Sequence, residues 1–180
     1  WSATKTLKAT GYDSGISPLL IMGGGYDPCE DAEPNTCTSP KGNKIYVMDA
    51  KTGEIKKTFT TIRSVAGDVT VVPNQFTGMA DYAYAADTGG NVYRIMIGPD
   101  APADWVMTKI AALGCDTPTC ATGGELNRKF LFAPEVVVVA PNFNAVLIGS
   151  GDREHPLPTN KATGVPNAFF MLKDKPWDSN

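Results

Sequence analysis

The sequence lacks both a long apolar run and an excess of basic residues. Its 180 residues include one histidine, and 16 Lys and Arg stand against 19 Asp and Glu. No apolar run approaches the ~20 residues that a helix needs to cross a bilayer. Without a basic patch the chain has no electrostatic footprint for nucleic acid or an anionic membrane. We therefore expect no nucleic-acid partner and no membrane insertion.

The N-terminus carries neither an initiator methionine nor a signal-peptide pattern, since the chain opens on Trp1. This start is typical of a mature or excised piece. With 42% hydrophobic residues, the chain is long enough to bury the core of one domain. Its 18 glycines and 14 prolines favour many turns over long helices. We expect a single domain over residues 1–180.

The four cysteines form two close pairs, Cys29 with Cys37 and Cys115 with Cys120. Four cysteines allow three pairings, and proximity in sequence favours a bond within each pair. Neither loop contains a histidine, so a zinc site lacks its usual ligands and spacing. The sequence predicts two local disulfides and hence an oxidising compartment, the periplasm or the cell exterior.

Short apolar segments separated by turn residues indicate an all-β fold. Val, Ile, Tyr and Phe dominate these segments, as pleated strands prefer, and no segment sustains a period of 3.6 residues. The expected strands are residues 18–23, 44–49, 54–60, 68–73, 81–87, 91–97, 105–113, 134–141, 144–149 and 168–173.

The strands recur at a fixed period. Ile21, Tyr84 and Leu147 occupy similar strands, with spacings of 84 − 21 = 63 and 147 − 84 = 63. A strand, a glycine turn and a second strand in each copy are typical of propeller blades. We expect a partial β-propeller of about two to three four-stranded antiparallel blades. The blades are expected near 15–66, 67–131 and 132–180, with one complete blade at about 68–113.

Two or three blades cannot close a ring, and open strand edges must pair with something. A β-sandwich-like fold is the alternative, because repeated hairpins also build sandwiches. In a terminal blade without a neighbour, apolar face residues would be exposed, and we expect self-association through faces or open edges. The candidate face residues are Leu19, Ile21, Val47, Val137, Val139, Phe169 and Met171.

The segment 46–54 holds a hairpin turn in which Asp49 can accept hydrogen bonds from the backbone N–H groups of Lys51 and Thr52. Asp87 begins a similar turn at 87–91. The pattern Asp-Ala-x-Thr-Gly resembles the blade signature of quinone-dependent dehydrogenases, but scaffold propellers use the same aspartate to fasten a turn. We favour the structural interpretation and keep the dehydrogenase fragment as an alternative function.

The loop closed by the first cysteine pair is acidic. Asp27, Asp31, Glu33 and Asn35 stand at nearly alternate positions, and their oxygens could converge on calcium. The alternative is a solvated acidic surface loop.

The segment 152–156 contains Asp152, Glu154 and His155, a combination that can support acid–base chemistry. Residues so close in sequence seldom converge on one substrate, and no Ser or Cys nucleophile stands beside them. We expect a turn with ion pairs there, no catalytic residue, no cofactor, and therefore no enzyme.

Four segments together are specific enough to indicate a family. GGGYDP at 23–28, KIYVMDAKTG at 44–53, DYAYAADTGGNVYR at 81–94 and IGSGDREHP at 148–156 resemble the C-terminal propeller of PilY1-type pilus assembly and tip-adhesin proteins. The matches extend over about residues 11–174. Their order and spacing carry more weight than any single motif.

The resemblance implies a type IV pilus protein exported to the periplasm and carried to the cell surface at the pilus tip. It implies a role in pilus extension, twitching motility and attachment, with minor pilins or a host or surface receptor as partners. An unrelated periplasmic scaffold propeller is the alternative.

The resemblance also implies a calcium loop of the form Asp-x-Asp-x-Asp-Gly-x-x-Asp. The corresponding residues here are 73–81, where Gly78 and Asp81 fit the pattern. Pro73, Gln75 and Thr77 replace the three leading carboxylates, and a hard dication would lack most of its ligands. Asp81 is therefore interpreted as a remnant, and the sequence predicts no tight calcium site in this turn.

Overall fold

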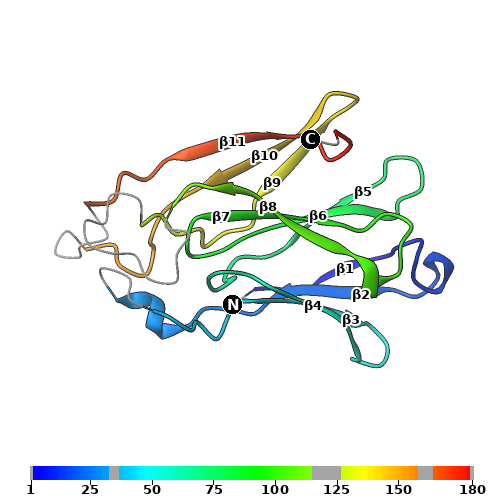
Figure 1. Cartoon of the computed structure of the whole chain (residues 1–180), viewed down its shortest axis with the longest axis horizontal. Coiled ribbons are helices and arrows are strands. Elements are labelled where there is room, and N and C mark those ends of the chain that lie inside the picture. Colours follow the sequence, from blue (N-terminus) through cyan, green and yellow to red (C-terminus); the bar gives the residue numbers. More distant parts are fainter. Residues whose placement is uncertain (1, 33–36, 115–126, 158–163, 179–180) are drawn as a thin grey trace.

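The structure, a computed structural model, describes residues 2–32, 37–114, 127–157 and 164–178. Three antiparallel sheets follow one another along the chain (Figure 1). The first sheet contains β1 (Lys5–Leu7), β2 (Leu19–Gly23), β3 (Lys44–Asp49) and β4 (Ile55–Thr60). The second contains β5 (Thr70–Pro73), β6 (Ala80–Ala86), β7 (Asn91–Met96) and β8 (Val106–Ala112). The third contains β9 (Glu135–Val139), β10 (Phe143–Gly149) and β11 (Phe169–Asp174), and three short 3-10 helices, η1 (Asp13–Gly15), η2 (Pro28–Asp31) and η3 (Pro102–Asp104), complete the described elements.

Within each sheet, strands that are consecutive in the sequence are neighbours. The all-β class is confirmed, with three separate sheets of three or four strands, as in a partial propeller or a sandwich-like fold. Ile21, Tyr84 and Leu147 lie in β2, β6 and β10, the second strand of each sheet, opposite Val47, Arg94 and Met171. The 63-residue period therefore marks a real structural repeat.

The expectation of a single complete blade is wrong. The first sheet also has four strands, because β1 pairs with β2 through Lys5 opposite Ile21 and Leu7 opposite Leu19. A three-residue strand of which only Leu7 is buried shows no alternation that a sequence pattern can reveal. Each of the ten expected strands overlaps one of β2–β11.

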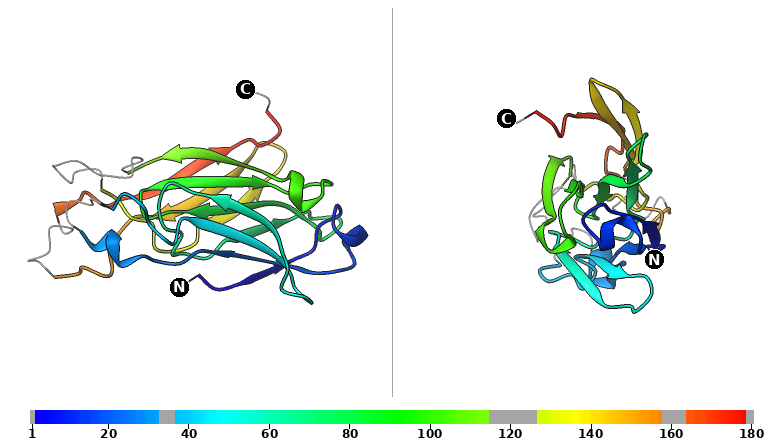
Figure 2. Two further views of the ribbon diagram at one scale, coloured as in Figure 1. Left: turned by 60° about the horizontal axis from the view of Figure 1, so that its bottom comes forward. Right: turned by 90° about the vertical axis from the view of Figure 1, so that its right-hand side faces the viewer.

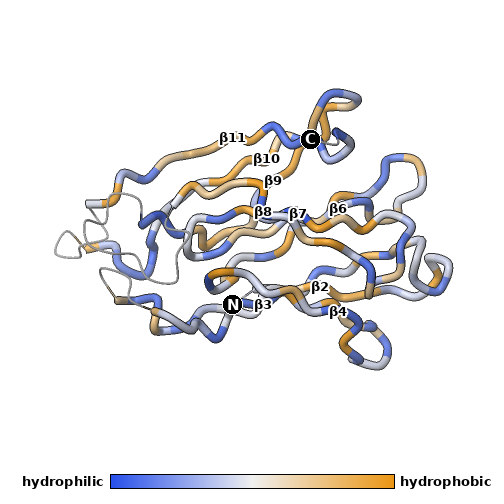
Figure 3. The backbone as a smooth tube through the Cα atoms, viewed as in Figure 1, coloured by the Kyte–Doolittle hydropathy of each residue, from blue (hydrophilic) through white to orange (hydrophobic). Residues whose placement is uncertain are grey.

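The three sheets stack face to face, and the second lies between the other two (Figures 1 and 2). Successive side chains of a strand point to opposite faces, and β6 shows this directly. Ala83 and Ala85 pack in the cluster shared with the first sheet, whereas Tyr84 and Ala86 pack in the cluster shared with the third. Figure 3 shows the apolar residues concentrated along the strands and the hydrophilic ones in many of the connecting loops.

The predicted face residues divide into two groups. Leu19, Ile21 and Val47 are fully buried between the first and second sheets, so they are not exposed as an unpartnered blade would require. The third sheet behaves differently, because its outer face carries exposed apolar side chains at Val137, Phe169 and Met171. Only the second sheet is covered on both sides by the described residues.

None of the helices in the described ranges is long and apolar enough to span a bilayer.

Candidate functional site

Asp49 closes the turn between β3 and β4. Its Oδ1 accepts hydrogen bonds from the backbone N–H groups of Lys51 at 2.9 Å and Thr52 at 2.6 Å, and from the Thr52 hydroxyl at 2.9 Å. The Tyr12 hydroxyl donates to Oδ2. These donors, Tyr12 foremost, hold the pKa of Asp49 well below its usual range. The predicted turn-fastening role is confirmed.

Asp87 does the same in the second sheet, but it is fully buried. Its Oδ1 accepts from the backbone N–H groups of Gly89 at 2.9 Å and Asn91 at 3.1 Å. Its Oδ2 accepts from the Tyr93 hydroxyl at 2.8 Å and from the backbone N–H of Arg63 at 3.0 Å. Burial raises the pKa of Asp87, and these hydrogen bonds oppose that effect. The carboxylate thus ties the β6–β7 turn to the connection between the first two sheets.

A buried ion pair joins the cysteine loop to that connection. Glu30 and Arg63 are both 0% exposed, and Arg63 Nη2 lies 3.5 Å from Glu30 Oε2. Arg63 Nη1 donates to the carbonyl oxygen of Cys37 at 2.8 Å, and the backbone N–H of Ser64 donates to Glu30 Oε1 at 3.3 Å. Buried charges require such partners, because desolvation penalises an isolated ion.

Lys129 extends this network to the third sheet. Its buried ammonium donates to the carbonyl oxygen of Glu30 at 2.8 Å and to Asp152 Oδ2 at 2.6 Å. His155 Nδ1 lies 3.0 Å from the same oxygen. Burial alone would raise the pKa of Asp152, but Lys129 and His155 together lower it. Loops from all three sheets are therefore cross-linked by charge at one end of the stack.

The segment 152–156 forms the expected turn with ion pairs. The backbone N–H of Glu154 donates to Asp152 Oδ1 at 3.2 Å, and that of His155 donates to the Asp152 carbonyl oxygen at 3.2 Å. Asp152 uses both oxygens in these contacts. Its geometry is that of a structural cross-link.

The first cysteine pair forms a disulfide, with the Cα atoms of Cys29 and Cys37 5.2 Å apart. Cys115 and Cys120 lie outside the described residues. The predicted bond within the acidic loop is thus present, and the other remains a prediction.

The four candidate calcium ligands of the acidic loop do not all fall in the described ranges, since Glu33 and Asn35 lie outside them. The two carboxylates of Asp27 and Asp31 serve different partners. Asp27 caps η2 by accepting from the backbone N–H of Cys29 at 3.0 Å, and its other oxygen accepts from the backbone N–H of Lys41 at 2.6 Å. The Lys41 and Cys29 hydrogen bonds lower the pKa of Asp27. Asp31 Oδ1 accepts from the Tyr26 hydroxyl at 2.6 Å. Across the described ranges, no three His, Cys, Asp or Glu side chains form a group that could hold a metal ion.

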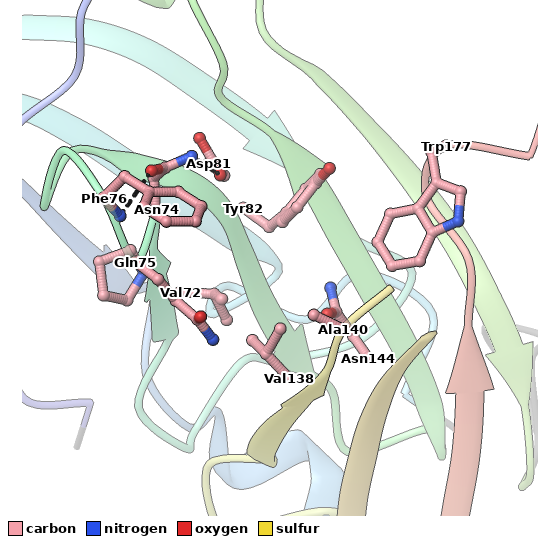
Figure 4. A pocket seen from close by; sticks show the side chains of 11 residues that line it. Val72, Asn74, Gln75, Phe76, Asp81, Tyr82, Val138, Ala140, Asn144 and Trp177 are labelled. Atoms are coloured by element: carbon pink, nitrogen blue, oxygen red, sulfur yellow. Dashed lines mark hydrogen bonds between the residues drawn. The ribbon is translucent and has the colours of Figure 1, made fainter. Parts of the chain in front are cut away.

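The β5–β6 turn is closed by an amide. Asn74 Oδ1 accepts from the backbone N–H groups of Phe76 at 2.9 Å and Thr77 at 3.1 Å, while its Nδ2 donates to Asp81 Oδ2 at 2.9 Å (Figure 4). Gly78 has φ of 70°, which favours glycine. The residues of this turn do not fit the calcium site that the resemblance implies, because an N–H donor faces the one remaining carboxylate.

A cavity of about 260 Å³ lies between this turn and the third sheet. Phe76, Tyr82 and Trp177 contribute aromatic rings, and Asp81 contributes a carboxylate (Figure 4). We call this cavity, lined by these four side chains over Val72 and Val138, the aromatic pocket. Phe76 is 95% exposed although it is a large apolar side chain. A single exposed aromatic side chain is common on protein surfaces, and this one borders the cavity.

The outer face of the third sheet is a second candidate surface. Val137 lies opposite Ala145, and Val139 lies opposite Phe143. On the other side of β10, Leu147 lies opposite Met171. These side chains share a face, because they alternate with the inward residues of their strands. The exposed members of this face are Val137, Phe169 and Met171, and exposed apolar patches can mark interaction surfaces.

Sequence patterns did not reveal the buried charges or the aromatic pocket. Arg63 and Lys129 stand in connecting segments, where a cation normally indicates a solvated surface. Phe76 and Trp177 are far apart in the sequence and line one cavity only because the second and third sheets pack together. The acidic loop around Glu30 suggested a metal rather than an ion pair, and the segment 152–156 indicated ion pairs but not the partner Lys129.

Comparisons with known proteins point to one fold. No family model matches the sequence, and no curated protein matches it. The structure is similar to the crystal structure of the Pseudomonas aeruginosa PilY1 C-terminal domain, with a TM-score of 0.68 and 16% sequence identity. The match covers 99% of this chain and 38% of that chain. The chain therefore has the fold of a part of the PilY1 C-terminal domain, which confirms at the level of the fold the resemblance that its motifs indicate.

Proposed function

We propose that the chain is an exported binding and assembly module of a type IV pilus protein. It would support pilus extension, twitching motility and surface attachment at the pilus tip, with minor pilins or a surface receptor as partners. The observation that carries this proposal is the likeness to the PilY1 C-terminal domain over 99% of the chain.

The disulfide supports an exported location. The Cys29–Cys37 bond closes a loop next to the buried Glu30 and Arg63. Disulfides persist in oxidising compartments and are rare in the cytosol. A module that works in the periplasm or on the cell surface can therefore rely on this bond.

The use of the carboxylates supports a non-catalytic role. Asp49, Asp87 and Asp152 hold turns and connections through several hydrogen bonds each. General acid–base groups need a proton within reach of a substrate, and these oxygens are already engaged with the protein itself. The same turns support a structural rather than a quinone-binding interpretation of the Asp-Ala-x-Thr-Gly pattern.

The outer face of the third sheet supports self-association with a second copy of the chain. Glu135 lies opposite Leu147, whereas Lys173 lies opposite Ala145 on the other edge of the sheet. One exposed anion and one exposed cation at opposite edges make the face complementary to itself. A two-fold related copy can therefore bring Lys173 to Glu135 while the apolar side chains meet.

Deletion of the codons for residues 2–178 in the source bacterium tests the pilus role. We expect the deletion strain to lose surface pili and twitching, and the intact gene supplied in trans to restore both. The conservative variant Glu54→Gln, at an exposed position, is the matched control and should leave both unchanged. Normal pili and twitching in the deletion strain would reject the proposal and favour an unrelated periplasmic scaffold.

A further inference from the structure

The aromatic pocket combines rings, a carboxylate and an apolar floor in one small cavity. Phe76 and Tyr82 approach from the second sheet and Trp177 from the segment after β11 (Figure 4). Val72 and Val138 line its lower part. A cavity of about 260 Å³ is small for a whole drug-sized ligand but sufficient for one side chain.

Asp81 gives the pocket its charge. Its Oδ2 accepts a hydrogen bond from Asn74, and within the described residues its Oδ1 has no hydrogen-bond partner. It is the one ionisable carboxylate among the described residues that line the cavity. The pocket therefore favours a cation.

Two cations near residues of the pocket, Arg94 close to Tyr82 and Lys175 two residues before Trp177, already have carboxylate partners. Arg94 Nη1 lies 2.6 Å from Asp174 Oδ1, and Lys175 Nζ lies 3.4 Å from Asp178 Oδ2. Burial raises the pKa of Tyr82, so its phenol stays neutral. The negative charge of Asp81 is thus left for an incoming group.

The pocket wall beside the third sheet is held by a hydrogen-bonded chain. Asn144 Nδ2 donates to the Tyr84 hydroxyl at 2.9 Å, and that hydroxyl donates to Asp174 Oδ2 at 2.7 Å. Asn144 and Tyr84 are buried, so these contacts fix β6 relative to β10. A preorganised wall lowers the entropy lost when a ligand binds.

We propose that the aromatic pocket binds the side chain of a lysine presented by a protein partner. The methylene stem lies along Val72 and Val138, and the ammonium faces the aromatic rings and Asp81. Ring faces attract cations through their quadrupole, and a carboxylate adds charge complementarity. Lysine combines an apolar stem with a charged end, which matches both parts of the cavity. This inference does not depend on the pilus assignment.

The test follows the Trp177 indole N–H signal by NMR while a capped peptide with a single lysine is added to the full chain. A peptide with norleucine in place of lysine keeps the stem and removes the charge. Methyl glucoside, a neutral sugar, is the third probe. We use concentrations up to about 10 mM, because one side chain alone binds weakly.

We expect the lysine peptide to shift the indole signal to saturation, with at most small shifts from norleucine and the sugar. Asp81→Asn and Phe76→Ala should each weaken binding about two- to fivefold, as loss of one charge or cation–π contact implies. The matched controls Asp104→Asn and Phe132→Ala alter exposed residues outside the cavity and should leave binding unchanged.

Equal shifts from lysine and norleucine would overturn the proposal, because the pocket would then be merely apolar. A shift from methyl glucoside without one from lysine would identify a sugar site instead. No shift from the lysine peptide would also reject it. If Asp81→Asn fails to fold, Trp177→Ala, outside every strand, supplies the same test by the loss of shifts at Tyr82.

Discussion

Glu30 and Arg63 form an ion pair that is wholly shielded from solvent, with 3.5 Å between Oε2 and Nη2. Glu30 stands in the disulfide loop after β2, and Arg63 stands in the connection from β4 to β5. Lys129, from the connection to the third sheet, donates to the carbonyl oxygen of Glu30. The pair therefore lies at the centre of the contacts that join the three sheets at this end.

The first prediction concerns this pair. Glu30→Gln removes the carboxylate charge that lies 3.5 Å from the buried Arg63, and breaking a buried pair in this way costs about 3–5 kcal/mol. Chemical denaturation should show that loss in the free energy of unfolding. Glu54→Gln breaks the exposed pair with Lys56 and should cost under about 1 kcal/mol. Similar losses in the two variants would contradict the central role of the Glu30–Arg63 pair.

The second prediction concerns the disulfides. Peptide mapping without reductant should give Cys29 joined to Cys37 and Cys115 joined to Cys120. In the chain-entropy model, a bond closing a loop of eight residues contributes about 2–3 kcal/mol to stability. Replacement of Cys29 and Cys37 by serine should lower the unfolding free energy by up to that amount. Free thiols, or a bridge from one pair to the other, would show that the pairing is wrong.

The third prediction is a pH dependence at Asp152. Its pKa in the folded chain lies below the ordinary value of 3.8, so the ionised form is favoured by folding. The stabilisation is present above pH 3.8 and is lost as the pH falls through the folded pKa. The unfolding free energies of the wild type and Asp152→Asn should therefore converge as the pH falls from about 6 to about 2. A difference that stays constant over this range would contradict the charge contacts with Lys129 and His155.

The fourth prediction concerns self-association through the third sheet. Sedimentation velocity should show a dimer whose population rises with concentration. Met171→Glu places a charge among the exposed apolar side chains of the outer face and should give a monomer. Ile55→Glu, on the first sheet, is the matched control, since Met171 and Ile55 are each 54% exposed. A wild-type chain that is monomeric at all concentrations would reject this interface.

The strands could be predicted because the sequence features that indicate a strand lie within the strand and its flanking turns. Alternation and turn residues located β2–β11, and the period from Ile21 to Leu147 revealed the repeat. Strand β1 was not predicted, because its three residues show no alternation of apolar and polar side chains. Its position in the sheet depends on pairing with β2. A local pattern also could not predict which face of a sheet is covered by another sheet. Val47 and Val137 stand in strands with similar alternation, but only Val47 has a sheet packed over it.

The turn aspartates could be predicted for the same reason, since Asp49 and its donors lie within three residues. The contacts of the buried charges could not, because Lys129 and the Glu30 carbonyl oxygen to which it donates are 99 residues apart. The partners of these charged side chains depend on how the three sheets stack, and no spacing of residues in the sequence indicates that stacking. The β5–β6 turn combines a predictable and an unpredictable feature. The sequence shows that carboxylates of the calcium pattern are replaced in this turn, but it does not show the cavity beside Trp177.

The location of the protein tests the central claim, a module of an exported pilus protein, most directly. Pili sheared from the source bacterium can be probed with an antibody raised against the 180-residue chain. We predict a signal in the sheared fraction of the wild type and none in that of a strain without the major pilin. A signal confined to the cytosol, or equal in the two sheared fractions, would contradict the proposed function.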